Sequence, residues 1–388
     1  MINISRLYCG LAGESDDLRY RKSGSSGPVI AYNCTARCNL NCLHCYSSSR
    51  STAGNNELTT QQAKQVLHQL SEASCPVVLF SGGEPLLRAD LYELLAEAKA
   101  LNLRTALSTN GTLIDSQAAS KLAETGIGYV GVSIDGGEDF HDQFRRAKGS
   151  FKAALTAIEN CRKASLRTGL RFTILKGNVD QVSVAFDIAA SAGVRRICFY
   201  HLIRTGRAVN LDGQTPSADQ TRRVLDVIID RTAEFAHKGL IDEVLTVDNH
   251  ADGPYLLVRM RKEDNARFEE AEKLLLANGG NRVGERIACI GWDGSIYPDQ
   301  FWRNYSLGNV REKPFAQIWQ DTGDPVLYKL RHKDEFADAR CLKCTWFTLC
   351  KGNYRFLGKD SADKNWLNEP ACYLTDNEII RTAQLSER

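Results

Sequence analysis

The chain has 388 residues, of which 43% are hydrophobic and 25% are charged, so it can bury a sizeable core in two or three structural units. A formal net charge of +2 without a long basic run argues against nucleic acid as a partner. The N-terminal residues lack the apolar core of a signal peptide, and no apolar run long enough to span a membrane occurs. We therefore expect a cytoplasmic protein without a membrane partner.

Short apolar runs alternate with amphipathic stretches from residue 29 onward, which is the pattern of parallel strands joined by crossover helices. The predicted strands are residues 29–32, 77–80, 104–108, 129–133, 170–174 and 196–200. Six strand and helix units form a partial (β/α)6 TIM-type barrel, an α/β fold in which the chemistry belongs to the loops at the carboxyl ends of the strands.

Composition and motifs divide the chain into four parts. Residues 1–28 form an N-terminal extension, and residues 29–210 form the partial barrel. Residues 211–280 are charged and helical in pattern, so they are predicted to form a connecting segment or lid. Residues 281–388 carry a second group of cysteines and form a C-terminal domain.

Thirteen cysteines in a large chain without a leader favour metal or redox chemistry over disulfides. Cys38, Cys42 and Cys45 lie in the stretch CNLNCLHCY, just after the first predicted strand. Three thiolates can hold three irons of a 4Fe-4S cluster and leave the fourth iron open for a small ligand. The alternative is a zinc site completed by a distant ligand such as Cys34 or His141.

Small and polar residues follow the next three predicted strands. They form the stretches SGGEP (81–85), STNG (108–111) and SIDG (133–136). Each stretch alone is typical of a turn, but at successive strand ends they describe a ring around one ligand. In the first stretch the paired glycines let the backbone approach a ligand closely, and Glu84 offers a carboxylate to a cation.

The cysteine spacing, with His44 just before the last cysteine and GGEP after the second strand, resembles the radical S-adenosylmethionine (SAM) superfamily over roughly residues 29–210. The resemblance implies that SAM chelates the open iron and is cleaved by one electron to a 5′-deoxyadenosyl radical. It implies that Glu84 takes the methionyl ammonium and that the SAM contacts are His44, Gly82, Gly83, Glu84, Ser108, Asn110, Ser133 and Arg145. For Arg145 and Arg146 a solvated surface pair is an equally weighted alternative.

A second cysteine group comprises Cys341, Cys344, Cys350 and Cys372. Spacing alone is compatible with a tetrahedral zinc site. The tail resembles the SPASM domain, which implies a fully liganded auxiliary 4Fe-4S cluster that relays electrons.

The common two-cluster SPASM form has further cysteines, and here those places are taken by Tyr354 and Asp299, which leaves Cys289 without partners. We therefore predict one auxiliary cluster and two 4Fe-4S clusters in total. The remaining cysteines are predicted to be small buried hydrophobic residues: Cys9, Cys34, Cys75, Cys161, Cys198 and Cys289.

Four further stretches indicate which substrate to expect: residues 4–10, 243–256, 299–315 and 371–379. They resemble the tetrapyrrole-processing radical enzymes over essentially the whole chain. The resemblance implies removal of the two acetate side chains of 12,18-didecarboxysiroheme, which gives iron-coproporphyrin III in heme biosynthesis. Removal of propionates from the same substrate in the heme d1 branch is the near alternative. Reduced ferredoxin or flavodoxin is the expected electron donor, and a monomer is expected.

A siroheme derivative is a flat apolar macrocycle with a rim of carboxylates, so its pocket should combine aromatic surface with arginines. The candidate substrate contacts are Tyr200, His201, Arg204, Arg207, His250, Trp302 and Arg303. For each one, a core aromatic or a solvated arginine is the ordinary alternative. His201 and His250 are candidate ligands of the substrate iron, although a lone histidine is more often structural.

Two other classes of function share these motifs. A peptide-modifying maturase would share the barrel and the clusters, but such enzymes often carry a peptide-recognition module before the barrel, and only 28 residues precede the first strand here. A non-enzymatic electron-transfer scaffold would use both clusters without needing SGGEP or STNG.

Overall fold

The computed structural model describes residues 1–13, 16–20, 27–353 and 371–380. Its centre is an 11-stranded sheet in the order β1-β8-β7-β6-β5-β4-β3-β2-β9-β10-β11. The strands that run parallel to one another from one edge of the barrel to the other are β2 (Val29–Thr35), β3 (Val77–Gly82), β4 (Arg104–Thr109), β5 (Tyr129–Ser133), β6 (Thr168–Ile174), β7 (Arg196–His201) and β8 (Glu243–Val247). The six predicted strands are β2 to β7, which confirms the partial barrel.

Strand β8 extends the barrel beyond the prediction. It lies within residues 211–280, which the sequence pattern assigned to helices, and it pairs parallel with β7. The rest of this segment is helical, in α9 (Ala218–His237), α10 (Asp252–Lys262) and α11 (Phe268–Asn278). The segment therefore belongs to the wall of the barrel as well as to its outside.

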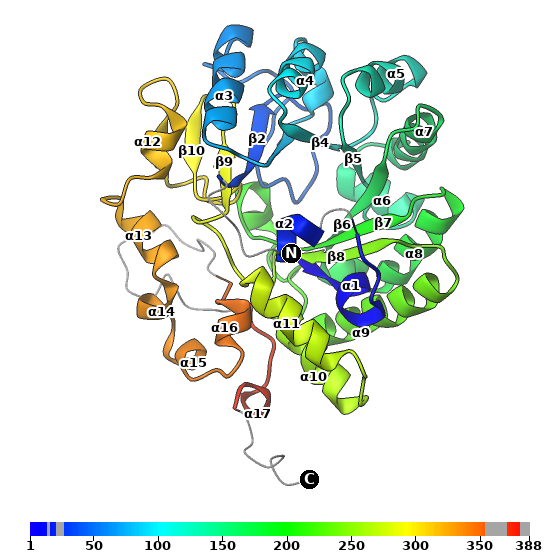
Figure 1. The fold of residues 1–388 in the computed structure, drawn as a ribbon. Coiled ribbons are helices and arrows are strands. Elements are labelled where there is room, and N and C mark those ends of the chain that lie inside the picture. Colours follow the sequence, from blue (N-terminus) through cyan, green and yellow to red (C-terminus); the bar gives the residue numbers. More distant parts are fainter. Residues whose placement is uncertain (14–15, 21–26, 354–370, 381–388) are drawn as a thin grey trace.

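Amphipathic helices cover the outside of the curved sheet (Figure 1). Between the strands lie η1 (Pro85–Leu87), α3 (Thr60–Glu72), α4 (Leu91–Ala100), α5 (Ser116–Glu124), α6 (Glu138–Arg145), α7 (Ser150–Lys163), η2 (Lys176–Gln181), α8 (Val182–Ser191) and η3 (Gly206–Asn210). Helix α3 begins at a capping box formed by Thr59 and Gln62 and buries Val66, Leu67 and Leu70, because these positions share one helical face.

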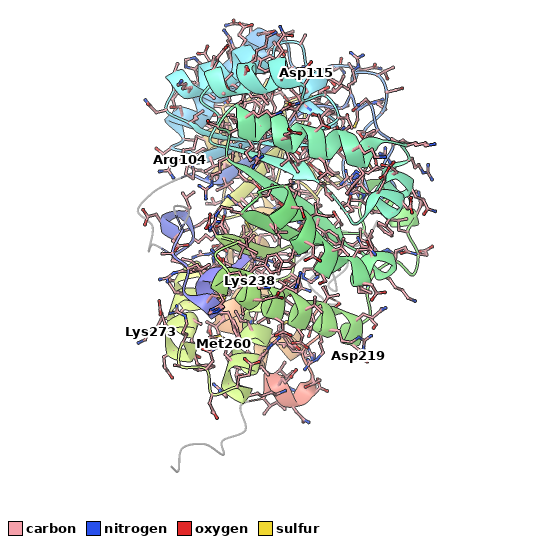
Figure 2. All side chains as sticks on the ribbon, turned by 90° about the vertical axis from the view of Figure 1, so that its right-hand side faces the viewer. Arg104, Asp115, Asp219, Lys238, Met260 and Lys273 are labelled. Carbon is pink, nitrogen blue, oxygen red and sulfur yellow. The ribbon has the colours of Figure 1, made fainter. Side chains whose placement is uncertain are left out.

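The direction of the helices shows which end of the barrel carries the strand ends. In Figure 2, Arg104 at the start of β4 and Lys238 just after α9 lie toward one side of the molecule, and Asp219 near the start of α9 lies toward the other. Because a crossover helix begins where its strand has ended, the side of Asp219 is the side of the carboxyl ends.

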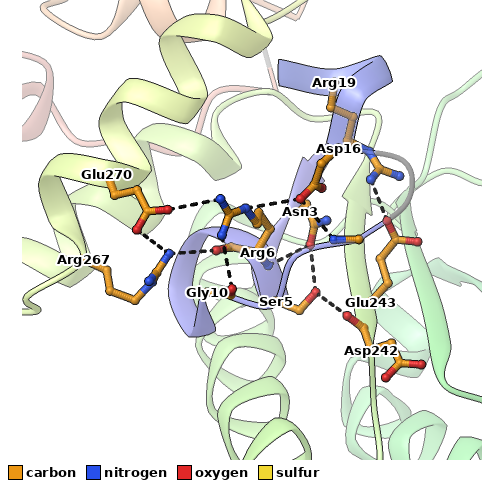
Figure 3. A network of polar contacts seen from close by, with 11 residues as sticks. Asn3, Ser5, Arg6, Gly10, Asp16, Arg19, Asp242, Glu243, Arg267 and Glu270 are labelled. Atoms are coloured by element: carbon orange, nitrogen blue, oxygen red, sulfur yellow. Dashed lines mark hydrogen bonds and ion pairs between the residues drawn. The ribbon is translucent and has the colours of Figure 1, made fainter. Parts of the chain in front are cut away.

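The N-terminal extension closes the opposite end of the barrel. It forms β1 (Ile2–Asn3), α1 (Ile4–Cys9) and α2 (Asp16–Tyr20). Strand β1 pairs antiparallel with β8. In Figure 3, Arg6 lies between Asp16 at 3.3 Å and Glu270 at 3.2 Å, and Arg19 reaches Glu243 at 2.6 Å. Since Glu243 is the first residue of β8, these ion pairs hold the extension at the amino ends of the strands.

The C-terminal part continues the same sheet and then turns helical. Its strands are β9 (Ile287–Ile290), β10 (Ser295–Tyr297) and β11 (Gly308–Asn309), and its helices are α12 (Phe315–Trp319), α13 (Pro325–Arg331), α14 (Lys333–Phe336), α15 (Ala339–Leu342), α16 (Phe347–Cys350) and α17 (Asp376–Ile379). Strand β9 pairs parallel with β2, which places this part beside the start of the barrel (Figure 1). No helix in the described ranges is long and apolar enough to cross a bilayer.

Candidate active site

One cavity lies at the carboxyl ends of the barrel strands. Its volume, including the space at its open mouth, is about 950 Å³. Cys38, Cys42 and Cys45 line it together, as the sequence predicted. Seven of the eight predicted SAM contacts also lie on its wall: His44, Gly82, Gly83, Ser108, Asn110, Ser133 and Arg145. The strand ends therefore do form a ring around one space.

The cysteine loop is held in place by its own backbone and by η3. The Cys38 N–H donates to the Arg50 carbonyl at 2.7 Å, which closes the loop. The Arg207 guanidinium donates from Nε to the Cys42 carbonyl at 2.8 Å and from Nη1 to the Ser49 carbonyl at 2.5 Å. Arg207, predicted to contact substrate, holds the cysteine loop and does not line the cavity.

Polar neighbours act on all three thiols. Burial raises the pKa of Cys38 to about 11, and the Leu40 N–H, which donates to its sulfur at 3.4 Å, opposes that rise. Burial raises the pKa of Cys42, and the guanidinium of Arg145, whose Nη1 lies 3.6 Å from the thiol, opposes that rise. At Cys45 burial acts in the same direction, but the hydroxyls of Ser47 and Ser49, each 3.3 Å from the sulfur, help to hold the pKa below its usual value. Nearby donors therefore favour the anionic form at Cys45, whereas at Cys42 they only partly offset the effect of burial.

The ligands of the alternative zinc site are not brought to the triplet. Cys34 is buried, and its thiol donates to the Ser81 carbonyl at 3.4 Å. His141 is buried, and its Nδ1 accepts from the Asp135 N–H at 3.2 Å. Neither side chain lines the cavity, so neither stands where a fourth ligand would be needed.

The paired glycines of SGGEP bring two chain segments together. Gly82 has φ +121°, and a Cβ on Gly83 would lie 2.0 Å from the Arg37 carbonyl oxygen. The Gly83 N–H donates to the Thr35 carbonyl at 2.7 Å. The glycines are thus needed for close packing against the segment that leads into the cysteine loop, and they reach the cavity wall from there.

Glu84 lies behind the cavity wall. Its carboxylate is fully buried and accepts hydrogen bonds from the Asn110 N–H and the Thr109 hydroxyl, both at 2.8 Å. Burial raises the pKa of this carboxyl to about 7, and the hydrogen bonds oppose the rise. In this structure Glu84 clamps the end of β3 to the end of β4 and is the one predicted SAM contact that does not reach the cavity.

Arg145 is a buried residue of the site. It forms an ion pair with Asp135 of the SIDG stretch, with Nη2 to Oδ2 at 2.6 Å, and Asp135 also accepts from the Thr173 N–H at 3.0 Å. Burial acts to raise the pKa of Asp135, but the charge of Arg145 keeps it below the usual value. The alternative of a solvated surface pair is therefore wrong for Arg145, while Arg146 ends α6 with φ +54°.

His44 presents an unsatisfied ring nitrogen. The ring stacks on Phe144 with centroids 4.4 Å apart, and burial lowers the pKa of the imidazole to about 3, so the ring is neutral. Within the described part of the chain its buried Nδ1 has no hydrogen-bond partner. His44 lines the cavity, but this nitrogen is shielded, so any contact with a bound group would come from the other atoms of the ring.

Of the seven predicted substrate contacts, Tyr200 and His201 line the cavity. Arg204 instead lies on the surface, 43% exposed, in an ion pair with Asp212 at 2.6 Å. The backbone N–H of His250 donates to the side chain of Asn353. Neither Arg204 nor His250 lines the cavity, so their contact with substrate stays a prediction.

Trp302 and Arg303 also lie outside the cavity. Trp302 is 1% exposed and packs in a small core between the barrel and the C-terminal helices. The Arg303 guanidinium lies between the rings of Trp292 and Tyr297, at 4.5 and 4.8 Å from their centroids. The neighbouring Phe301 reaches the cavity in their place.

A second, smaller cavity of about 350 Å³ gathers the other four predicted ligands, Cys341, Cys344, Cys350 and Cys372. Nη1 of Arg340 donates to the Cys372 sulfur at 3.3 Å, and the Gly352 N–H donates to the Cys350 sulfur at 3.1 Å. The late cysteine is thus brought back to the CxxC pair, as predicted.

Three positions bear on the number of auxiliary clusters: Asp299, Cys289 and Tyr354. Asp299 accepts from the Phe301 N–H at 2.7 Å, and the Asn33 amide lies 3.5 Å from the buried Cys289 sulfur. Tyr354 lies outside the described residues, so a single auxiliary cluster stays a prediction. Of the six other cysteines, five are buried as predicted, but Cys9 is only partly buried, so the prediction is wrong there.

Comparison with known proteins identifies the family. The model of the Radical SAM superfamily matches residues 32–187, and that of the SPASM iron-sulfur cluster-binding domain matches residues 282–345. The Fe-coproporphyrin III synthase of Methanosarcina barkeri is 44% identical over 98% of this chain and 99% of its own length. This chain belongs to the radical SAM superfamily.

A second sequence relative and a solved structure are also similar to this radical SAM enzyme. The pre-heme d1 synthase of Dinoroseobacter shibae is 37% identical over 92% of this chain and 88% of its own length. The crystal structure of Streptococcus suis SuiB bound to precursor peptide SuiA has a TM-score of 0.71 at 17% identity, covering 90% of this chain and 76% of that chain. At that identity the likeness shows the fold alone.

The two sites fit the cofactors of the superfamily. A radical SAM domain implies a 4Fe-4S cluster with SAM, and a SPASM domain implies an auxiliary iron-sulfur cluster. The first cavity offers three cysteine sulfurs, the ring of His44 and polar strand ends; the second offers four cysteine sulfurs. Cys38, Cys42 and Cys45 would hold the first cluster beside SAM, and the C-terminal cysteines would hold the second.

A buried chain of hydrogen bonds joins the walls of the two cavities in the radical SAM enzyme. His201, on the first wall, has Nε2 2.9 Å from Asp252 Oδ2. The Tyr373 hydroxyl donates to Asp252 Oδ1 at 2.7 Å, and the preceding Cys372 lines the second cavity. Asp252 is fully buried. The Asp252 carboxylate therefore contacts both His201 on the first cavity wall and Tyr373, the residue after the cavity-lining Cys372.

Replacing Tyr373 with phenylalanine is expected to lower the free energy of unfolding by about 1–3 kcal/mol, because it leaves an oxygen of buried Asp252 without this donor. Tyr8→Phe is the matched control, since the Tyr8 hydroxyl bonds Glu263 at 2.7 Å on the exposed surface and its loss should cost less than about 0.5 kcal/mol. Urea unfolding at equal iron content measures both. Equal losses in the two variants would contradict the role of the buried chain.

Sequence reasoning missed several residues of the cavity wall: Tyr46, Arg171, Asp248, Gln300 and Phe301. Asp248 follows β8 with φ +70°, an uncommon backbone conformation that was invisible while this stretch was assigned to helix. Arg171 carried a readable signal, because it alternates with Leu170 and Phe172 in an otherwise apolar strand.

Proposed function

We propose that this enzyme removes the two acetate side chains of 12,18-didecarboxysiroheme and thereby forms iron-coproporphyrin III. The observation that carries the proposal is the 44% identity, over nearly the full length of both chains, to a protein named Fe-coproporphyrin III synthase. The cavity supports it chemically, because an open cluster site shares its wall with Arg171 and the aromatic rings of Tyr46, Tyr200 and Phe301.

When bound, the first cluster and SAM supply a radical able to abstract a hydrogen atom, and the second cluster supplies a route for electrons. The protein positions the reactants. The cysteine loop, fixed by Arg207, sets where the open iron would stand, and the strand ends at Ser108, Asn110 and Ser133 line the space beside it. Tyr200 at the end of β7 and Tyr46 and Phe301 on loops add aromatic surface to the same wall, against which a flat macrocycle can be positioned.

The substrate determines which bond breaks. The acetate hangs on a saturated quaternary ring carbon, and the neighbouring carbon carries a propionate and one hydrogen. Loss of that hydrogen leaves an unpaired electron next to the bond that must break. Scission then forms a ring double bond, which extends the conjugation of the macrocycle. The released carboxymethyl fragment takes up one electron and one proton and becomes acetate. The sequence of events runs once on each of two rings.

A radical SAM enzyme needs an external electron donor, and we assign this role to reduced ferredoxin or flavodoxin acting on a cytoplasmic monomer. The main alternative is removal of propionates in the heme d1 branch, which the 37% identity to pre-heme d1 synthase favours less than the first assignment. A maturase activity is also favoured less, because the mycofactocin maturase MftC of Mycolicibacterium smegmatis is 30% identical over 85% of this chain, and SuiB shares the fold at 17% identity.

Anaerobic incubation of the reduced enzyme with SAM and didecarboxysiroheme tests the proposal. We expect iron-coproporphyrin III as the tetrapyrrole product, identified by mass spectrometry against an authentic standard. The matched control omits SAM and should leave the substrate unchanged. A product that has lost propionate-derived carbon and kept both acetates would move the enzyme to the heme d1 branch, and an unchanged tetrapyrrole would refute both assignments.

A further inference from the structure

Arg171 is a cation on the inner wall of the barrel. It lies on β6, where Leu170 and Phe172 are fully buried against the helices outside, and the alternation of a strand turns Arg171 and Thr173 to the cavity. The neighbouring strand leaves room for it. Gly131 on β5 has no side chain, and a Cβ there would lie 2.7 Å from Arg171 Cδ. The arginine is thus built into the wall.

Neutral groups surround the guanidinium of Arg171. It stacks over the ring of Tyr200, with Cζ 4.3 Å from the ring centroid. The other titratable side chains near it are those of Cys198, Tyr129 and Tyr46. The Arg171 backbone is bonded within the sheet, where its carbonyl accepts from the Ile134 N–H at 3.0 Å, but among the described residues its guanidinium has no ion pair and no hydrogen bond. A guanidinium stays protonated in proteins, so a positive charge with unused donors faces the cavity.

Arg145, the other arginine on this wall, already has an ion-pair partner. Its guanidinium is paired with Asp135 at 2.6 Å and lies beside the Cys42 thiol. The wall also carries Asp248, which forms no ion pair with Arg171. The donors of Arg171 are therefore open to an anion that enters with a ligand. A planar guanidinium matches a carboxylate with two parallel hydrogen bonds.

We propose that Arg171 binds a propionate carboxylate of the tetrapyrrole and fixes the rotation of the macrocycle in the cavity. This inference rests on the proposed function, since it names the group of that substrate which the site recognises. Tyr200 lies under the guanidinium and lines the same cavity, so an aromatic ring borders the place of the carboxylate. Because the substrate must be presented once for each acetate, a single fixed anchor requires a different propionate to occupy it in each round.

The test compares Arg171→Gln with Arg204→Gln, a matched loss of an arginine whose ion pair lies on the surface. The probe is iron-coproporphyrin III, titrated anaerobically without reductant and followed by its absorption. Arg171→Gln should weaken binding about 10- to 100-fold, the loss expected for a charge-assisted hydrogen bond, and Arg171→Lys should recover part of it. Arg204→Gln should bind as the unaltered enzyme does.

Two further measurements show whether weaker binding in Arg171→Gln reflects a lost contact with the propionate carboxylate or a lost contact with SAM. The methyl ester of the probe should bind the unaltered enzyme and Arg171→Gln equally weakly, because it has no carboxylate to lose. Cleavage of SAM to 5′-deoxyadenosine without tetrapyrrole should be unchanged in Arg171→Gln; reduced cleavage would overturn the proposal by assigning Arg171 to the SAM carboxylate. Equal affinity of the unaltered enzyme and Arg171→Gln for the probe overturns the role of Arg171 alone. Failure of the unaltered enzyme to bind the probe overturns the proposed function with it.

Discussion

Replacing Cys42 with alanine is expected to abolish cleavage of SAM to 5′-deoxyadenosine. The thiolate would hold one of three protein-bound irons, and in the structure it is also the sulfur nearest to the Arg145 guanidinium, at 3.6 Å. Without it the cluster that delivers the electron would lose a ligand, while Arg145 stays paired with Asp135. Alanine at Cys38 or Cys45 should have the same result.

The matched control for Cys42→Ala is Cys161→Ala. Cys161 is fully buried on α7, far along the chain from either cysteine group, so its loss removes only packing. Cleavage is measured anaerobically with dithionite as the reductant, at equal protein concentration. The control should retain full cleavage. Retained cleavage in Cys42→Ala would contradict the assignment of the triplet to the SAM-binding cluster.

Replacing Cys344 with alanine should remove about half of the protein-bound iron and leave SAM cleavage intact. Cys344 lines the second cavity only, and that cavity shares no cysteine with the first. Formation of iron-coproporphyrin III should stop, because the released acetate fragment would have lost its route for the required electron.

Cys289→Ala is the control for Cys344→Ala and also tests the number of clusters. Cys289 is buried beside Asn33 and lines neither cavity, so its loss should leave the iron content unchanged. Iron and zinc are counted in each purified variant by elemental analysis. If Cys344→Ala loses zinc and keeps its iron, the second site is a zinc site. If Cys289→Ala loses iron, a third cluster is present.

The position of the cavity was predictable because parallel strands bring their carboxyl ends to one edge. Cys38, Ser108 and Ser133 are far apart in the sequence, yet each lies at the end of a strand or just after it, and all line one cavity. Strand β8 was missed because five buried residues between two long helices carry no decisive period.

The direction of individual side chains was less predictable. Arg207 and Phe301 illustrate this. Arg207 follows a strand end, as a substrate contact would, but the φ of +58° at Gly206 turns the chain so that the guanidinium meets the back of the cysteine loop. Trp302 and Phe301 are adjacent aromatic residues, and only the local turn capped by Asp299 decides which one is buried in the core. Such turns depend on contacts between distant segments.

The most direct test of the central claim uses didecarboxysiroheme carrying 13C in its two acetate side chains. After anaerobic turnover with SAM and reductant, the label is followed into free acetate and into the tetrapyrrole by NMR and mass spectrometry. Our account predicts that all of the label leaves the macrocycle as acetate, two molecules for each iron-coproporphyrin III formed, and that Cys42→Ala releases none. Label that stays on the macrocycle while SAM is cleaved would contradict it.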